Sequence, residues 1–477
     1  MTEQARLTWD VAEWVVSRQR TALPTDLDHH VRRMILDHLA GVVASSVGPV
    51  SAAVAQHAAR AYPGQAATAI GHGRLSPLGA AVVNGTNGHG IEADEGYTPG
   101  SMHPTSVVLP AVFAVAQERG IDVAEPERVL IAAAVGMELA CRIAAAGHPA
   151  TRHRHFHNTP LAGVLGAAAA VSALLDLDAT GVANALGIAA SHAGGVFEFL
   201  SGSADVKRLH PGKAARDGIV SADLAQAGLT GPTTALEGKD GYFAAFAGTP
   251  GTDWFPGIVR DGLGERWVLL DTYVKPYPCC RHLHGAIDAV LALRSQHTID
   301  PATVEEIHVG TFKIATGHAG TDLDTVLQAQ LSIPYTVAVA LLRGAVTLTD
   351  FDAESRADAT AQELAGKVVV ALDADADAAY PKTGRPAEVT IVLKDGSRLT
   401  HRVQHPYGEP ANPLPDVALE EKVRNLVVPV IGDEGAEALI KAAWGFSGLA
   451  FLDDIDRAVR EGNARGRHAA HDATQRA

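Results

Sequence analysis

Alanine-rich segments with helical character fill the chain from about residue 26 to residue 246. Ala and Leu favour helices, and small side chains let neighbouring helices approach closely. Strand signals are scarce in this region. The helices that we expect here cover residues 31–47, 76–84, 129–145, 161–175 and 206–227. The first prediction is therefore a large helical domain.

The pattern changes near Asp271. Residues 303–312 interleave apolar and polar side chains, and residues 387–403 contain two extended runs joined by Asp395-Gly396, a strong hairpin signal. Further helices are expected at 334–343, 358–366, 416–426, 434–443 and 453–461. We predict a mainly α fold with an α+β part. Its domains are a helical domain (1–271 and 406–461), a smaller α+β lid domain (272–405) and a flexible tail (462–477).

Composition narrows the classes of function. The 477 residues, 47% of them apolar, suit two structural units. Lys and Arg number 39 against 54 Asp and Glu, and the net charge of −15 opposes binding to nucleic acid or to an anionic membrane. Three cysteines without CxxC spacing indicate neither a zinc site nor a redox pair. With no secretory signal or membrane span recognised, we expect a cytoplasmic protein.

Two segments concentrate histidines beside helix or loop signals. In residues 89–105, the carboxylates of Glu92, Asp94 and Glu95 precede His103, and their mutual repulsion could raise a carboxylate pKa into a catalytic range. A solvated acidic loop explains the same cluster. In residues 153–159, three histidines alternate before a helix expected from Pro160. Alternation could suggest a metal site, but no carboxylate or cysteine at customary spacing supports one, so we expect no metal.

Two further segments are basic. Residues 205–213 contain Lys207 and His210 at the start of a helix, where side chains and helix amides could together bind an anion. A solvated helix end is the alternative. Residues 275–284 contain Lys275, the adjacent pair Cys279-Cys280, and Arg281, at the predicted domain junction. Arginine grips carboxylates bidentately, whereas buried cysteine commonly behaves as a small hydrophobe, so a thiol nucleophile is disfavoured.

Several common catalytic motifs were not found in the sequence. GxGxxG opening a helix, GxxxxGK[ST], GxSxG and HExxH were not recognised, which removes the usual signals for hydride transfer, phosphoryl transfer, α/β-hydrolase and zincin chemistry. Proton chemistry without a cofactor remains.

The charged segments, taken in this order, resemble the MmgE/PrpD family, which includes 2-methylcitrate dehydratase, cis-aconitate decarboxylase and iminodisuccinate epimerase. The matching motifs are Asn84-Gly85 to His103-Pro104, Phe156-His157-Asn158-Thr159, Lys207-Arg208-Leu209-His210-Pro211-Gly212, Lys275-Pro276-Tyr277-Pro278, Ser332-Ile333-Pro334-Tyr335, and His405-Pro406 to Asn412-Pro413. The resemblance covers roughly residues 8–460. It implies a large helical domain, a small α+β lid, a site between them and a homodimer.

The resemblance also implies the site residues. By motif they are Glu92, His103, His157, Lys207 and Tyr335, with Asp94 beside them in the acidic loop. One departure concerns this loop, because the family's decarboxylases and dehydratases have a DxxDT-like run. This chain has residues 92–97 in its place, with one extra residue before His103, and the family's threonine is lost unless Thr98 replaces it. The substrate of a named family member therefore cannot be carried over directly.

A mechanism follows from these residue types. Removing a proton next to a carboxylate requires cations at that carboxylate and a placed base. We expect four side chains to bind carboxylates: Lys207, His210, Lys275 and Arg281. His103 and His157 would exchange protons, Glu92 or Asp94 would orient a histidine, and Tyr335 would donate to a developing anion.

The resulting prediction is a cofactor-independent lyase acting on a small di- or tricarboxylate, as a dehydratase or a decarboxylase. The preference for a lyase comes from the family's membership. An epimerase of a dicarboxylate or a noncatalytic carboxylate-binding protein is the alternative.

Overall fold

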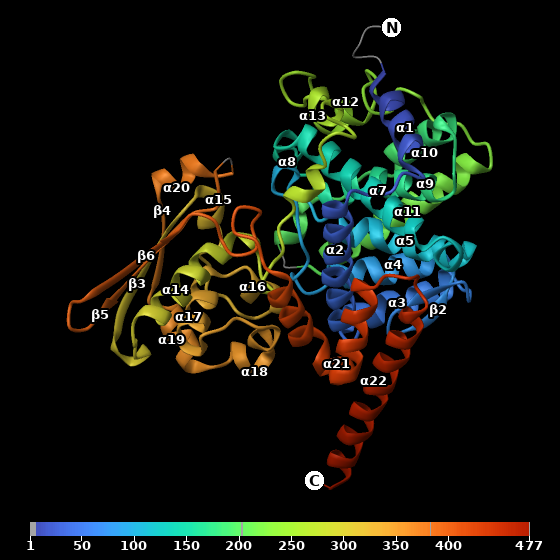
Figure 1. The fold of residues 1–477 in the computed structure, drawn as a ribbon. Helices are drawn as coiled ribbons and strands as arrows, with labels where there is room; N and C mark the ends of the chain where they lie inside the picture. The colour runs from blue at the N-terminus through green and yellow to red at the C-terminus, as the bar shows by residue number, and fades with distance from the viewer. Residues whose placement is uncertain (1–5, 202–203, 382, 477) are drawn as a thin grey trace. The chain divides into compact units, whose positions relative to one another are not determined.

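Two sets of chain segments form separate units in the computed structural model, which describes residues 6–201, 204–381 and 383–476 (Figure 1). The first unit comprises Met1–Gly90, Asp94–Thr272 and Asp416–Ala477, and the second comprises Ile91–Ala93 and Tyr273–Pro415. The first is helical apart from a short β-ribbon, and the second combines helices with a sheet. This confirms the predicted mainly α fold with an α+β part.

The first unit is built from helices that follow one another with short connections. Its helices are α1 (Leu7–Arg18), α2 (Thr25–Ser45), α3 (Pro49–Ala61), α4 (Pro77–Gly88), α5 (Thr105–Arg119), α6 (Ile121–Ala124), α7 (Pro126–Gly147), α8 (Ala150–His153), α9 (Asn158–Leu174), α10 (Ala179–His192), α11 (Val206–Gln226), α12 (Tyr242–Phe246), α13 (Pro256–Arg260), α21 (Asp416–Trp444) and α22 (Phe451–Arg476). The ribbon pairs β1 (Ala67–Ala69) with β2 (Gly73–Leu75).

Helix α9 occupies the core of this unit, and each of its residues is buried. It packs against α7, α11 and α5. The crossing with α7 depends on glycine, because a Cβ on Gly166 would lie 2.5 Å from the carbonyl oxygen of Gly136. Helix α7 is long and apolar enough to span a membrane, but its apolar window is completely buried, as in the core helices of soluble proteins. The small residues thus bring helices together as the sequence indicated.

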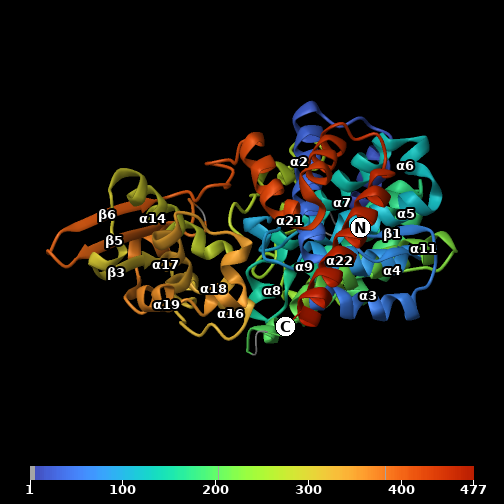
Figure 2. The same ribbon diagram turned by 90° about the horizontal axis from the view of Figure 1, so that it is seen from below.

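The C-terminal segment packs with the N-terminal helices of the same unit. Helix α21 lies against α2 and α22 (Figure 2), and Lys422 donates to the buried carboxylate of Asp37. Gly432, with φ of +72°, breaks α21 into the two helices expected from the sequence. Helix α22 continues through Arg476, over the segment for which we expected a flexible tail.

The second unit contains a four-stranded sheet in the order β4-β3-β5-β6. The strands are β3 (Val304–Thr311), β4 (Val368–Leu372), β5 (Ala387–Leu393) and β6 (Arg398–Val403). Strand β3 is parallel to β4 and antiparallel to β5, and β5 is antiparallel to β6. The turn between β5 and β6 contains Gly396 with φ of +84°, as the Asp-Gly signal predicted.

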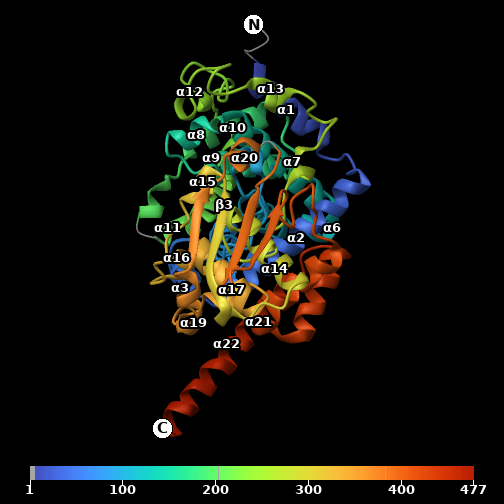
Figure 3. The ribbon, with the colours of Figure 1, turned by 90° about the vertical axis from the view of Figure 1, so that its left-hand side faces the viewer.

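Helices cover one face of this sheet. The helices of the second unit are α14 (His284–Gln296), α15 (Lys313–Thr316), α16 (Val326–Gln330), α17 (Ile333–Arg343), α18 (Ala353–Arg356), α19 (Ala359–Ala365) and α20 (Ala374–Ala379). Helix α14 packs on β5 and β6, and α17 packs on β4; Figure 3 views the sheet with these helices behind it. Ile307, Val309, Val389 and Ile391 alternate along their strands and are buried in the core between sheet and helices.

Candidate active site

Four histidines and an aspartate meet inside the first unit. His89 follows α4, Asp94 and His103 belong to the loop before α5, His157 is the N-cap residue of α9, and His210 lies in the first turns of α11. Ring centroids are 5.0 Å apart for His89 and His103, 5.9 Å for His89 and His157, and 5.3 Å for His157 and His210. We call these five side chains the histidine cluster.

Asp94 holds two of the imidazoles. Its Oδ2 lies 2.6 Å from Nδ1 of His89 and 3.2 Å from Nδ1 of His103. Asp94 is 2% exposed and His89 is fully buried. An ionised carboxylate only accepts hydrogen bonds, so both Nδ1 atoms carry hydrogen when they bond to it.

His103 is fixed at three points. Its backbone N–H donates to Oγ1 of Thr159 over 3.2 Å, and its Nδ1 contacts both the carbonyl oxygen of Glu95 and the carboxylate of Asp94. Because both Nδ1 partners are acceptors, the neutral ring carries its lone pair on Nε2, the nitrogen that can remove a proton. The helix starts at Asn158 rather than at the expected Pro160, so Thr159 lies in its first turn, where its hydroxyl supports His103.

His157 and His210 face each other. Their Nδ1 atoms are 3.0 Å apart, so one ring donates and the other accepts. Burial, reinforced by the neighbouring His89, lowers the pKa of both imidazoles, to about 4 for His210. Both rings are therefore neutral near pH 7, and the pair offers one Nε2 with a lone pair and one with hydrogen.

Two backbone hydrogen bonds hold phenylalanine rings against the His157–His210 pair. The N–H of His157 donates to the carbonyl of Gly195 over 2.9 Å, and the N–H of Phe197 donates to the carbonyl of His155 over 2.9 Å. The rings of Phe197 and Phe199 then lie 5.1 and 5.5 Å from that of His157. These rings exclude water from one side of the histidines, which strengthens electrostatic interactions there.

Positive potential also reaches the cluster. His157 caps α9 and His210 lies in α11, whose first turns also contain Lys207, so two helix N-termini contribute their partial positive charge. The charge of Lys207 is one of the influences that lower the pKa of His157 and of His210. An anion bound here would be stabilised by the same charge and dipoles.

Glu95 is a buried acid beside the cluster. It is fully buried, and its carboxyl accepts the N–H of Thr105 over 2.8 Å and contacts the Thr105 hydroxyl. Burial, together with the neighbouring charge of Asp94, raises the pKa of Glu95 to about 8. Glu95 is therefore mainly protonated at pH 7, and the raised carboxylate pKa expected in this loop falls on it.

Glu92 and Lys275 belong to the second unit, where they contact each other. The ammonium of Lys275 donates to the carbonyl oxygen of Glu92 over 3.1 Å and lies 3.6 Å from its Oε2. The two residues are 4% and 1% exposed. Glu92 has φ of +57°, a conformation in which L-residues are uncommon. The predicted carboxylate ligand Lys275 is thus already paired with an acid.

Arg281 is also engaged within the second unit. Its guanidinium donates to Glu409 over 3.1 Å and to the carbonyl oxygens of Tyr407 and Pro406 over 2.9 and 3.2 Å, and it contacts Nδ1 of His284 at 2.7 Å. Arg281 is 4% exposed. These bonds indicate a structural role for Arg281 within the second unit, which the sequence did not suggest.

Tyr335 lies in the core of the second unit. It is fully buried, its ring is 6.1 Å from that of Phe351, and its hydroxyl donates to the carbonyl oxygen of Asp350 over 2.5 Å. Burial raises its pKa to about 12. Its predicted role as a proton donor remains a prediction.

The structure also shows where the candidate metal ligands lie. His153 and His155 are exposed while His157 is buried, so the three alternating histidines do not converge. The ligand atoms that converge in the described residues belong to His89, Asp94 and His103, all within 4.8 Å of one another. They could hold a metal, but the 2.6 Å separation of His89 and Asp94 is that of a hydrogen bond. Two ligands of tetrahedral zinc would lie about 3.3 Å apart.

The cysteines differ in their surroundings. Burial raises the pKa of Cys141 and Cys279 well above its ordinary value. Burial would do the same for Cys280, but His318, whose Nε2 lies 3.7 Å from its Sγ, lowers the pKa to about 7. Cys280 lies in the second unit and outside the histidine cluster.

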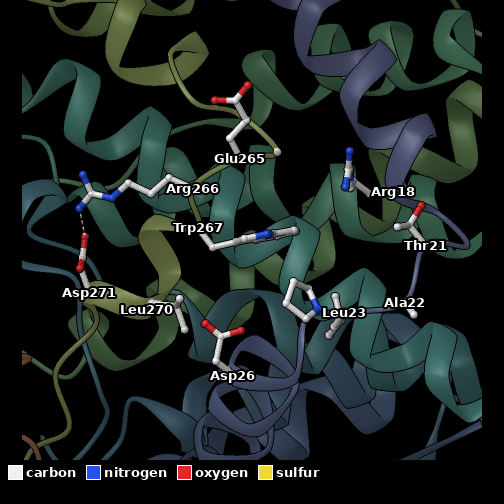
Figure 4. Close-up of a pocket in the computed structure, with 12 residues that line it drawn as sticks. Arg18, Thr21, Ala22, Leu23, Asp26, Glu265, Arg266, Trp267, Leu270 and Asp271 are labelled. Carbon is white, nitrogen blue, oxygen red and sulfur yellow. Dashed lines mark hydrogen bonds and ion pairs between the residues drawn. The ribbon is translucent and has the colours of Figure 1, made fainter.

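The structure thus gathers part of the predicted site. It brings together Asp94, His103, His157 and His210, with the charge of Lys207 acting on two of them. Sequence reasoning did not select His89 and Glu95, although both lie in the acidic segment it singled out. A cavity of about 600 Å³ lined by residues of the first unit, among them Arg18 and Trp267, shares no residue with the histidine cluster (Figure 4). The candidate site therefore rests on side-chain chemistry rather than on cavity size.

Comparison with known proteins relates the whole chain to others. The MmgE/PrpD N-terminal domain matches residues 10–254, and the MmgE/PrpD C-terminal domain matches residues 277–445. The cis-aconitate decarboxylase-like protein oryM of Aspergillus oryzae is 29% identical, with 91% of this chain and 93% of that protein covered. The cis-aconitate decarboxylase of Aspergillus terreus is 27% identical, with 94% and 95% covered. That of Homo sapiens is 29% identical, with 77% and 76% covered.

Proposed function

Because the chain belongs to the MmgE/PrpD family, we propose that it is a lyase that acts on a small di- or tricarboxylate by proton transfer and without a bound cofactor. The observation that carries the proposal is the histidine cluster, in which His103 is held by Asp94 while His157 and His210 share a hydrogen at the starts of two helices. Such a site combines oriented acid and base groups with positive potential.

Decarboxylation is the reaction we favour within this class, because relatives covering most of the chain are named cis-aconitate decarboxylase or cis-aconitate decarboxylase-like. In an unsaturated tricarboxylate of this kind, the bond from the methylene carbon to its carboxylate breaks and carbon dioxide leaves. The bonding pair forms a new double bond, and the electrons of the old one move to the carbon beside a remaining carboxylate. A proton delivered to that carbon completes the reaction.

The cluster supplies the groups that these steps need. Lys207 and the N-terminal amides of α9 and α11 stabilise the substrate carboxylates, and they also stabilise the charge that develops during bond cleavage. The His157–His210 pair, in which one ring carries hydrogen on Nε2, delivers the proton and regains one from water; His103, which Asp94 holds with a lone pair on Nε2, can do the same only after Nε2 has taken a proton from water. In the His157–His210 pair both rings are neutral, and the ring that accepts at Nδ1 carries the hydrogen on Nε2 that is available for delivery.

Epimerisation is the second candidate, and one observation favours it. The cluster has two separate places where a nitrogen lone pair is available, at His103 and at the His157–His210 pair. Removing a proton at one place and returning a proton from the other would invert a carbon centre next to a carboxylate.

A proton NMR experiment in heavy water distinguishes these reactions. The purified protein is incubated with cis-aconitate, citrate-like acids and hydroxy- or imino-dicarboxylic acids. New alkene signals with carbon dioxide release support the decarboxylase, and alkene signals without it support a dehydratase. Deuterium entering an unchanged skeleton supports the epimerase. No reaction across the panel, with His103→Gln as the inactive control, contradicts the proposed catalytic function.

A further inference from the structure

The backbone on both sides of His89 packs closely against helix α2. A Cβ on the preceding Gly88 would lie 2.4 Å from the His38 ring, and one on the following Gly90 would lie 1.8 Å from Oγ of Ser45. Both glycines therefore allow the chain around His89 to press against α2. The His89 side chain is fully buried, so it lies beneath the surface of the site.

The two nitrogens of His89 have different surroundings. Nδ1 lies 2.6 Å from Oδ2 of Asp94, the shorter of the two imidazole contacts to this oxygen. Nε2 is buried and makes no hydrogen bond to any described residue. Because the carboxylate accepts, Nδ1 carries the hydrogen, and a charge-assisted bond of this length is strong.

Asp94 consequently transmits the position of His89 to His103. Its Oδ2 receives both imidazoles, so a shift of the carboxylate toward or away from His89 changes its 3.2 Å contact with His103. A catalytic group displaced by about 1 Å can lose about 100-fold in rate.

We propose that His89 is a positioning residue, whose Nδ1–H anchors Asp94 so that the carboxylate fixes the orientation and the Nδ1–H tautomer of His103. His89 itself does not touch the substrate in this proposal. It acts through the carboxylate, in the way that a second hydrogen-bond partner orients a catalytic group. The kinetic consequence rests on the proposed function, whereas the structural consequence does not.

Two substitutions separate this role from direct acid or base chemistry. His89→Asn keeps an N–H near the position of Nδ1 and removes Nε2, whereas His89→Leu removes both. If His89 anchors Asp94, the Asn variant keeps kcat within about 5-fold of wild type. The Leu variant loses about 100-fold in kcat with KM little changed. Equal large losses in two folded variants would assign the chemistry to Nε2 and overturn the proposal, and so would near-normal kcat in both.

A spectroscopic measurement tests the same relationship without turnover. In the full-length protein labelled with ¹⁵N-histidine, nitrogen shifts report which ring nitrogen carries hydrogen. We expect Nδ1–H for both His89 and His103 in wild type. The His103 signal should be preserved in His89→Asn and be shifted or broadened in His89→Leu. Hydrogen on Nε2 of His89 in wild type would overturn the proposal without any variant, and so would an unchanged His103 signal in a folded Leu variant.

The two parts of the experiment keep the failures distinct. If the wild-type protein turns over no polycarboxylate while the nitrogen shifts behave as expected, the proposed function fails and the anchoring of Asp94 stands. If turnover is normal and the shifts do not respond to substitution of His89, the anchoring fails and the proposed function stands.

Discussion

The Nδ1 atoms of His157 and His210 lie 3.0 Å apart, and both side chains are nearly buried. Only one hydrogen fits between two ring nitrogens at this distance. A second proton would place two N–H groups against each other in a site that already contains Lys207 and two helix N-termini. The pair is therefore stable while both rings are neutral.

Acidification should lower the free energy of unfolding through the His157–His210 pair. The pKa of His210 is lowered to about 4, mainly by burial, whereas in the unfolded chain it returns to about 6.5. Between these values the unfolded state binds more protons, so the free energy of unfolding falls as the pH falls. In His210→Asn, the decrease between pH 7 and pH 5 should be smaller by about 2 kcal/mol. Urea unfolding at both pH values measures this, with the exposed His153→Asn as control; equal decreases in wild type and His210→Asn would contradict it.

Glu95 should have the opposite effect. Its pKa is raised from 4.5 to about 8, chiefly by burial, so between these values the native state binds more protons than the unfolded state. The stability contributed by the neutral carboxyl is present below the unfolded pKa and is lost as the pH rises toward 8. Glu95→Gln, which mimics the neutral acid, should gain stability relative to wild type between pH 5 and pH 8. Urea unfolding measures the free energy of unfolding of both proteins. If the difference between Glu95→Gln and wild type stayed constant from pH 5 to pH 8, Glu95 would be ionised in the native state and the prediction would fail.

The sequence predicted the fold well where periodicity and turn chemistry agree. The α7 and α9 segments were recognised because long runs of Ala, Leu and Val suit buried helices, and the β5–β6 hairpin was recognised from Asp395-Gly396. Strand β4 was missed, because its five residues follow directly after α19 and it pairs with β3 across a long stretch of sequence. Parallel pairing of this kind has no local turn signal.

The site was harder to predict, because the sequence shows which residues could act but not which partners they have. His89 looked like any other histidine until its distance to Asp94 was known, and the choice between Glu92, Asp94 and Glu95 depended on where the loop turns. Arg281 fitted a carboxylate ligand by residue type, but its partners are backbone carbonyls and Glu409, which lies 128 residues away in the chain.

His103→Gln tests the assignment of His103 to proton transfer. Glutamine keeps a hydrogen-bonding side chain of similar size but has no group that titrates near neutral pH, so turnover should fall about 100-fold or more. The thermal midpoint should change little, because the side chain is partly exposed. The control is His153→Gln, which changes an exposed histidine of α8. Steady-state rates and thermal unfolding of both variants measure the difference, and a His103→Gln rate close to that of the control would remove His103 from the mechanism.

Arg281→Met distinguishes structural support from substrate binding. It leaves buried Glu409 with Arg385, 2.9 Å away, and removes the donor to two carbonyl oxygens. We expect a loss of about 2–4 kcal/mol in the stability of the second unit. Arg281→Lys should restore little of it, since an ammonium cannot reach the same acceptors in a planar fork. Denaturant unfolding gives the loss. Unchanged stability with a raised KM would instead support the carboxylate-binding role predicted from the sequence.

Gly212→Ala should disturb the histidine cluster by changing the packing of α11 on α4. Gly212 follows His210 by two positions in α11, and a Cβ there would lie 2.3 Å from the carbonyl oxygen of Val82 and 2.7 Å from Oγ1 of Thr86, both in α4. Backbone cannot give way at such distances without moving α11. We therefore expect a loss of about 1–3 kcal/mol, together with a fall in turnover from displacement of His210. Gly194→Ala is the matched control, because nothing lies within 4 Å of its added Cβ. Equal stability and turnover in the two variants would mean that the crossing of α4 and α11 does not set the position of His210.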